Sequence, residues 1–368
     1  MGSRRKERCG WCGLKLMVPS DSQSFQCAVC QGITRAPTRP PLDLQLAAPT
    51  YRPPYYGGGG YASSLPPLLR PPPPPPPSLP YGRKKALLCG VGYRGKRYQI
   101  KGSINDVKCM RYFLLHKCGF PPDSILMLTE DETNPMRIPT KENIRMGLRW
   151  LVQGCQAGDS LVFHFSGHGS RQRDYDLDEV DGFDETLCPL DFETEGMIID
   201  DEVNATIVRP LPRAATLHAI IDSCYSATLL DLPFACRMNR DGQYTWADHR
   251  RPSPYYATKD TSGGLAICFS ACNDDETSAD TTAMTGNIST GALTYSFIQA
   301  VHNEPGLSYG RLLTAMRQAI QLARSGGLRL TGPIASLLNN TLFSTQLKQE
   351  PQLTCSQTFE VYSRQFTL

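Results

Sequence analysis

One histidine and one cysteine stand out because each closely follows an apolar run that is typical of a buried strand. His168 lies in the turn SGHG after residues 160–165 (SLVFHF), and Cys224 lies in DSC after residues 217–221 (LHAII). A thiol needs a base to become a nucleophilic thiolate and an acid to protonate a leaving amine, and a neighbouring imidazole can do both. Either residue alone is more often structural. Together, after two strands, they predict a catalytic Cys–His dyad.

Alternating strands and helices must position this dyad. Further strands are expected at 86–91, 124–128, 265–269 and, as an edge strand, 359–366, with helices at 104–118, 140–152, 291–302 and 308–324. This alternation predicts an α/β domain with a largely parallel central sheet flanked by helices. Ligands of such sheets bind beyond the carboxyl ends of the strands, so His168 and Cys224 should share one edge.

Two carboxylates can reach the same edge. Asp222 stands two residues before Cys224, and Asp106 opens the helix that follows the first strand of the domain. Paired carboxylates at the floor of a pocket would bind a guanidinium through charge-assisted, bidentate hydrogen bonds. The alternative is that Asp106 caps its helix and Asp222 is a structural acceptor.

Longer stretches of the chain resemble one family. The sequences SGHGS (166–170), LCPLDFETEGMIIDDE (187–202) and DSCYSATLLDLP (222–233) are similar to the metacaspases, which belong to the caspase-like peptidases, and the resemblance covers residues 83–368. It implies a caspase-like fold and an endopeptidase that cleaves after Arg or Lys, with protein or peptide substrates. Tyr225 and Ala227 stand where the family usually has His and Gly.

The resemblance also implies roles for individual residues. The catalytic dyad is His168 and Cys224, and the backbone N–H groups of Gly169 and Cys224 form the oxyanion hole. The implied pocket for the basic substrate residue consists of Asp106, Asp222, Ser103 and Ser166.

Acidic residues crowd between Asp174 and Asp201, and a solvated acidic loop is the default interpretation. Calcium, however, favours several carboxylates that converge from separate segments. By resemblance, the ligands of an activating Ca²⁺ are Asp184, Asp200, Asp201 and Asp231. Because Asp231 follows Cys224 by seven residues, a metal there can order the loop beside the nucleophile.

Residues 236–259 form a polar, Arg-rich connection that is expected to be a long loop. An enzyme that cuts after Arg and Lys can cleave its own loop, so we expect a zymogen that processes itself within 232–262. The cut would separate a large part, 83–231, from a small part, 263–368.

Two CxxC pairs near the N-terminus predict a structural zinc site. Cys9, Cys12, Cys27 and Cys30 supply four thiolates at a spacing that suits tetrahedral Zn²⁺. They define a zinc ribbon over residues 1–35, followed by a Pro/Gly-rich linker over 36–82. The ribbon resembles the lesion-simulating-disease type, and the combination resembles the type I metacaspases of plants. Regulatory proteins are the expected partners of the ribbon and linker.

Composition limits the other interpretations. The net charge of +3 is too small to argue for nucleic acid as the main partner, and no apolar run is long enough to span a bilayer. Single cysteines scattered in apolar runs suit a reducing compartment, so we expect a location in the cytoplasm, with the nucleus as a second location. The protein is also expected to be a monomer. The family resemblance places its role in programmed cell death or the stress response. The alternative function is a catalytically weak caspase-fold scaffold that regulates partners through its ribbon.

Overall fold

A computed structural model describes residues 4–8, 15–20, 22, 24–26, 33–35, 82–175, 182–239, 241–250, 259–273, 291–304, 306–324 and 349–368. The N-terminal residues contain two antiparallel pairs of strands. One pair joins β1 (Arg4–Arg8) to β2 (Lys15–Pro19), and the other joins β3 (Ser24–Gln26) to β4 (Ile33–Arg35). In the sequence, each CxxC pair lies between the two strands of one such sheet.

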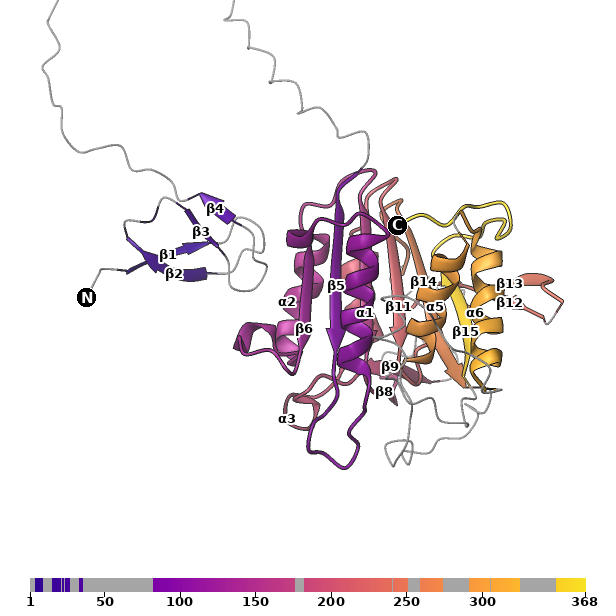
Figure 1. Cartoon of the computed structure of the whole chain (residues 1–368), viewed down its shortest axis with the longest axis horizontal. Coiled ribbons are helices and arrows are strands. Elements are labelled where there is room, and N and C mark those ends of the chain that lie inside the picture. The colour runs from indigo at the N-terminus through magenta and orange to yellow at the C-terminus, as the bar shows by residue number, and fades with distance from the viewer. Residues whose placement is uncertain are drawn as a thin grey trace, which may run out of the picture.

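The large C-terminal unit contains an eight-stranded sheet in the order β13-β12-β15-β14-β11-β7-β5-β6 (Figure 1). Its strands are β5 (Lys84–Gly90), β6 (Ile125–Thr129), β7 (Ser160–Ser166), β11 (Thr216–Asp222), β12 (Phe234–Met238), β13 (Tyr244–Asp248), β14 (Leu265–Asn273) and β15 (Gln349–Cys355). The five from β14 to β6 are mutually parallel, and the other three pair antiparallel. The prediction of a largely parallel sheet is confirmed.

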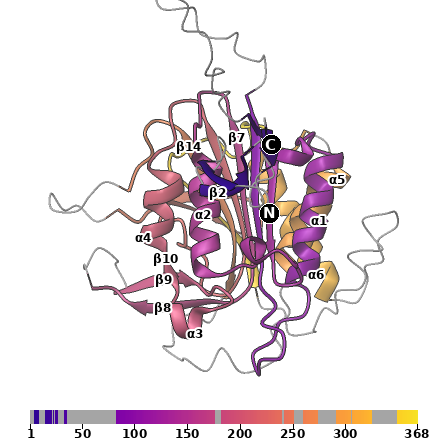
Figure 2. The ribbon, with the colours of Figure 1, turned by 90° about the vertical axis from the view of Figure 1, so that its left-hand side faces the viewer.

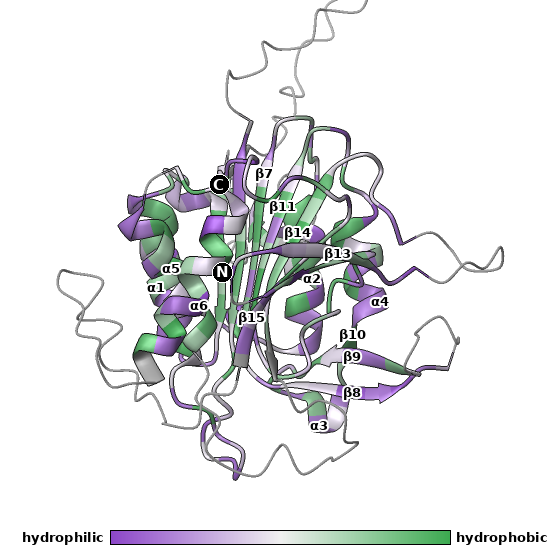
Figure 3. Cartoon of the chain, turned by 90° about the vertical axis from the view of Figure 1, so that its right-hand side faces the viewer, coloured by the Kyte–Doolittle hydropathy of each residue, from purple (hydrophilic) through white to green (hydrophobic). Residues whose placement is uncertain are grey.

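Helices cover both faces of this sheet (Figure 2). One layer holds α1 (Ser103–His116), α5 (Ala292–Asn303) and α6 (Tyr309–Arg324), and the other holds α2 (Lys141–Val152) and α4 (Asp200–Val203), which continues into a π-helical turn at Asn204–Val208. Successive residues of β5 alternate between the two cores, because Leu88 packs with α1 and Leu87 packs with α2. The central strands therefore consist largely of hydrophobic residues, drawn green in Figure 3, which contribute to a core on each face of the sheet.

Local patterns located most of these elements correctly. The helix expected from Thr140 begins there, since Thr140 Oγ1 accepts a hydrogen bond from the backbone N–H of Asn143 at 3.3 Å. Two expectations were wrong. The edge strand at 359–366 is absent, although this segment is fully described, and the final strand is β15, near the middle of the sheet.

The second error concerns the polar segment at 236–259. Much of it is the hairpin of β12 and β13, which extends the central sheet and forms its edge. The hairpin was missed because β13 is only half-buried, so its sequence carries no strong apolar alternation.

A second, three-stranded antiparallel sheet follows His168. It contains β8 (Gly169–Arg173), β9 (Phe183–Leu187) and β10 (Ile198–Ile199), with the short helix α3 (Phe192–Glu195) between the last two. This sheet was not expected from the sequence, and it carries several of the acidic residues. In the part of the chain that the structure describes, no helix combines the length and apolar character needed to cross a bilayer.

Candidate active site

His168 and Cys224 lie at one edge of the central sheet. Strands β7 and β11 are adjacent and parallel, and their last register pair is Ser166 with Asp222. His168 and Cys224 each follow that pair by two residues, so the two chains leave the sheet side by side. The predicted sharing of the carboxyl edge is therefore confirmed for their backbones.

Close backbone contact joins the two turns. A Cβ atom placed on Gly169 would lie 2.0 Å from the carbonyl oxygen of Cys224, a distance that no side chain tolerates. Glycine at 169 is thus required by the approach of the nucleophile's own peptide unit. The assignment of the N–H groups of Gly169 and Cys224 to an oxyanion hole stays a prediction.

The imidazole of His168 is held by the loop that follows β5. Its Nε2 lies 2.7 Å from the carbonyl oxygen of Tyr98, which can only accept, so Nε2 carries the proton. The ring of Tyr93 packs on the imidazole with centroids 4.8 Å apart, and its hydroxyl accepts a hydrogen bond from the backbone N–H of His168 at 3.0 Å. Nδ1 of the neutral ring is therefore left as the basic atom.

Burial lowers the pKa of His168 below its usual value of 6.5, and the hydrogen bond to Tyr98 opposes this only in part. The imidazole is thus neutral, and competent as a base, at neutral pH. We expect the imidazole of His168 to stay neutral from pH 7.5 down to about pH 6.5 and to be protonated only at more acidic pH. An NMR titration of the His168 ring tests the prediction, since kcat/KM would also respond to protonation of Asp106 and Asp222, and a midpoint above pH 6.5 would contradict it.

Three of the four residues predicted for the substrate pocket are brought together beside the dyad. Asp106 Oδ2 accepts a hydrogen bond of 2.8 Å from Ser166 Oγ, and Ser166 is the register partner of Asp222. The fourth, Ser103, is buried one helical turn before Asp106 at the start of α1. Asp222 Oδ2 accepts hydrogen bonds of 2.8 Å from both the backbone N–H and the hydroxyl of Thr294.

Among the residues that the structure describes, no hydrogen-bond partner is found for one oxygen of each of these two buried carboxylates. These atoms are Oδ1 of Asp106 and Oδ1 of Asp222. Burial raises the pKa of Asp106 well above its usual value, and the charge of Asp222 raises it further. Burial also raises the pKa of Asp222, against the lowering effect of Thr294. Buried carboxylates in this state are stabilised by an incoming cation.

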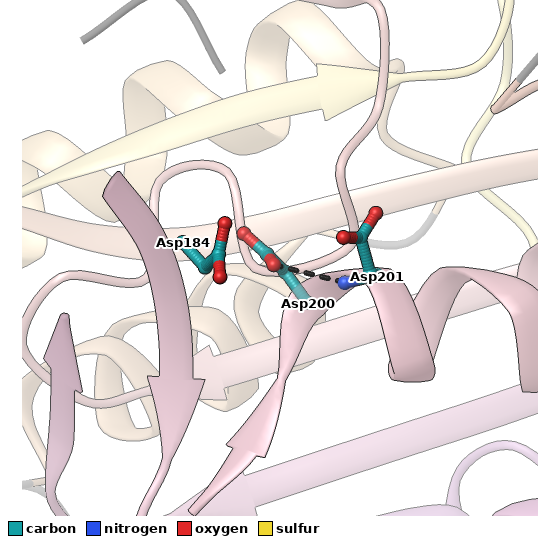
Figure 4. Close-up of side chains that lie close together, drawn as sticks. All are labelled: Asp184, Asp200 and Asp201. Carbon is teal, nitrogen blue, oxygen red and sulfur yellow. Dashed lines mark hydrogen bonds between the residues drawn. The ribbon is translucent and has the colours of Figure 1, made fainter. Parts of the chain in front are cut away.

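Three of the predicted calcium ligands form a cluster of their own. Carboxylate oxygens of Asp184, Asp200 and Asp201 lie within 4.8 Å of one another (Figure 4). They come from β9 and from the junction of β10 with α4. The fourth predicted ligand, Asp231, does not join this group directly. Its carboxylate forms an ion pair with Lys259, whose Nζ lies 3.4 Å from Asp201 Oδ1.

This geometry fits a calcium ion. Calcium takes six to eight oxygen ligands at about 2.3–2.6 Å, so neighbouring ligand oxygens within 4.8 Å of one another are compatible with a shared ion. The ammonium group of Lys259 already places a positive charge between two of the predicted ligands. The four cysteines predicted to bind zinc lie outside the described residues, and that site stays a prediction.

Sequence reasoning missed the residues that hold the dyad and the pocket in place. Tyr93 and Tyr98 follow β5, and Thr294 begins α5. Because β5 is next to β7 and parallel to it, the loop after β5 must reach the same edge, and this rule could have pointed to both tyrosines. No local signal in the sequence places Thr294 against Asp222.

The chain has close relatives along its whole length. A family model described as "Metacaspase, peptidase C14 domain" matches residues 84–233. Metacaspase-1 of Arabidopsis thaliana is 54% identical over 365 residues, which cover 98% of this chain and 95% of that protein. Metacaspase-3 of the same plant is 52% identical over 378 residues and covers 100% of both chains.

Similarity among solved structures is weaker. Protein GSU0716 from Geobacter sulfurreducens has a TM-score of 0.47 at 18% identity, covering 78% of this chain and 99% of that one. Caspase-1 from Spodoptera frugiperda has a TM-score of 0.34 at 11% identity, covering 78% of this chain and 89% of that one.

The match to the metacaspase, peptidase C14 model and to the Arabidopsis metacaspases identifies a cysteine-type peptidase, and in this chain a cysteine and a histidine leave adjacent parallel strands. Within that class, the chain belongs to the metacaspase family, and the predicted resemblance to plant metacaspases is confirmed.

Proposed function

We propose that this protein is a calcium-activated endopeptidase that cleaves after Arg or Lys and is made as a zymogen that processes itself. The observation that supports this specificity is the buried pair of Asp106 and Asp222, each with one oxygen that has no hydrogen-bond partner in the described part of the chain. A guanidinium or ammonium group from substrate would supply the missing charge and donors. An acidic substrate residue would meet like charge at the same place.

The dyad would act by acyl transfer. Nδ1 of His168 takes the proton of the Cys224 thiol, and the thiolate attacks the carbonyl carbon of the scissile bond. The imidazolium then gives its proton to the leaving amine, and a water molecule, deprotonated by the same imidazole, releases the acyl group. Tyr98 and Tyr93 keep the ring in the tautomer and orientation that these proton transfers need.

Two contacts link the acidic cluster to the loop that follows Cys224. The hydroxyl of Thr228 donates to the carboxylate of Glu185, the neighbour of Asp184 on β9. The guanidinium of Arg171 lies over the rings of Phe183 and Tyr225, with its central carbon 5.2 Å and 4.7 Å from their centroids. A calcium ion held by Asp184, Asp200, Asp201 and Asp231 would supply positive charge that fixes these segments.

A resting, inactive form is supported by the burial of the dyad. His168 is 5% exposed and Cys224 is 7% exposed, so only a small part of either residue is open to a substrate. The edge hairpin of β12 and β13, with the residues that follow it, lies within the region 232–262 that we expect to be cut.

The proposed function is tested with purified protein and fluorogenic peptides that carry Arg, Lys or Asp before the reporter group. We expect cleavage of the Arg and Lys peptides only, and only with calcium. Cleavage of the Asp peptide at a comparable rate would contradict the role of the buried carboxylates.

Removal of calcium is expected to abolish activity. EGTA should lower the rate on the Arg peptide to background, and excess Ca²⁺ should restore it, because the proposed ion would supply the charge that orders the loop after Cys224 for catalysis. Mg²⁺ at the same concentration is the control, since it demands a smaller octahedral site. Full activity in EGTA would exclude the calcium switch.

The remaining expectations stand as proposals with their own tests. Docking of regulatory proteins through the zinc ribbon and linker would be lost on Cys27→Ser, measured by pull-down with a partner that binds the intact chain. The proposed cytoplasmic or nuclear location is tested by imaging the tagged protein in cells. The proposed part in cell death or stress is tested by the phenotype of a knockout. A monomeric state would be contradicted by elution at twice the mass of 40.7 kDa.

A further inference from the structure

Lys259 places a positive charge at the side of the acidic cluster. Its Nζ forms an ion pair with Asp231 and lies 3.4 Å from Asp201 Oδ1. Asp201 belongs in turn to the group whose oxygens converge within 4.8 Å. The ammonium group therefore bridges the converging carboxylates and the one predicted ligand that stands apart from them.

This contact is not a loose surface ion pair. The side chains of Lys259, Asp201 and Asp231 are 19%, 26% and 11% exposed, so all three are largely withdrawn from water. Screening by solvent and salt is weaker at such positions than for fully exposed pairs. The partly buried ammonium group of Lys259 thus offsets the negative charge of Asp201 and Asp231.

The backbone of Lys259 is fixed to the same loop. Asn204 Nδ2 lies within hydrogen-bond distance of three carbonyl oxygens, those of Leu230 at 2.9 Å, Asp231 at 3.3 Å and Lys259 at 3.2 Å. The loop after Cys224 and the segment that begins at Lys259 are therefore held together by main chain and side chain. Replacement of the Lys259 ammonium group by another cation would therefore affect both the loop after Cys224 and the segment that begins at Lys259.

We propose that Lys259 is a built-in competitor of calcium. Its ammonium group occupies Asp201 and Asp231 in the resting protein, and calcium can engage these two carboxylates only by displacing it. Displacement removes the side-chain contacts of Lys259 and so loosens the start of the segment from Lys259 to Ser262, which lies within the region expected to be processed. The inference rests on the proposed calcium site, and it adds that this chain sets its own calcium threshold through one lysine.

Calorimetric titration of Ca²⁺ into the full-length Cys224→Ala protein tests the competition, because that background cannot process itself. Adding Lys259→Met, which keeps the length and removes the charge, is expected to tighten calcium binding about tenfold, the factor that corresponds to about 1.4 kcal/mol. Lys259→Arg should bind calcium as weakly as the parent. Lys108→Met is the matched control, since Lys108 pairs with Asp131 at 2.6 Å elsewhere on the molecule, and it should leave the affinity unchanged.

A second measurement does not depend on the variant's folding. In the Cys224→Ala protein, amide hydrogen exchange of residues 259–264 should become faster on saturation with calcium, as Lys259 leaves the carboxylates. Two results would overturn the proposal: calcium affinity that is equal with and without the Lys259 charge, or exchange that does not change. In either case, calcium binding by the Cys224→Ala protein would still support the proposed calcium site. If no variant bound calcium, both the site and the competition by Lys259 would be rejected.

Discussion

Replacing Cys224 with alanine is expected to lower kcat/KM for an Arg peptide by about 10⁴-fold or more, to the background of the assay. The reason is that no other described thiol can take its place at the sheet edge. Burial raises the pKa of the adjacent Cys188 to about 12, so that thiol stays protonated. The measurement is the steady-state rate with calcium, on protein purified in parallel with the wild type.

Cys155→Ala is the matched control for this experiment. Cys155 lies between α2 and β7, at the amino end of β7 and away from the dyad, and it should leave the rate unchanged. The Cys224→Ala protein should also remain a single chain during purification, because it cannot process itself. Persistent activity or fragmentation of this variant would point to a contaminating protease and remove support for Cys224 as the nucleophile.

Asp222→Asn is expected to lower kcat/KM for the Arg peptide by about 100- to 1,000-fold, because it removes one charge of a buried ion pair with substrate. The amide has the same shape and can still accept the two hydrogen bonds from Thr294, so the fold should be retained. The loss is measured with Arg and Lys peptides. Asp123→Asn, at an exposed site on the 3-10 turn before β6, is the control for the change in charge.

Thermal unfolding separates this substrate-binding role from a structural one. A carboxylate whose pKa is raised in the folded state binds its proton more tightly there than in the unfolded chain. The wild-type protein therefore loses stability as pH rises from the unfolded value of Asp222 through its raised folded value, and Asp222→Asn should not show this loss. We expect the Tm of the variant at neutral pH to equal or exceed that of the wild type. A lower Tm together with unchanged Arg selectivity would show that Asp222 is only structural.

Part of this architecture follows from local sequence. The apolar runs at β5, β7 and β11 are buried on both faces, and the rule that the carboxyl ends of parallel strands share an edge placed His168, Cys224 and Asp222 together. These conclusions needed only the period of the pattern and the order of strands and helices. The family itself could also be predicted, because its motifs surround the same residues.

Local signals failed where a segment is stabilised by distant partners. The hairpin of β12 and β13 was expected to be a loop, since β12 joins the sheet by pairing with β15, more than 100 residues later in the chain, and β13 pairs with β12. The segment 359–366 shows alternation but forms no strand in the described structure. Strand formation depends on an available neighbouring edge, which alternation alone does not reveal.

Residue types and spacing alone predicted a cysteine nucleophile, its histidine base and a pair of carboxylates at the same edge of the sheet. Only the tertiary structure decided which tautomer His168 adopts, which group holds Asp222, and that Lys259 lies against Asp201 and Asp231. The physical reason is the separation along the sequence of the groups that interact. Strand and helix periodicity acts over a few neighbouring residues, whereas each of these contacts joins groups that are remote in the chain and meet only when the sheet and its loops have assembled.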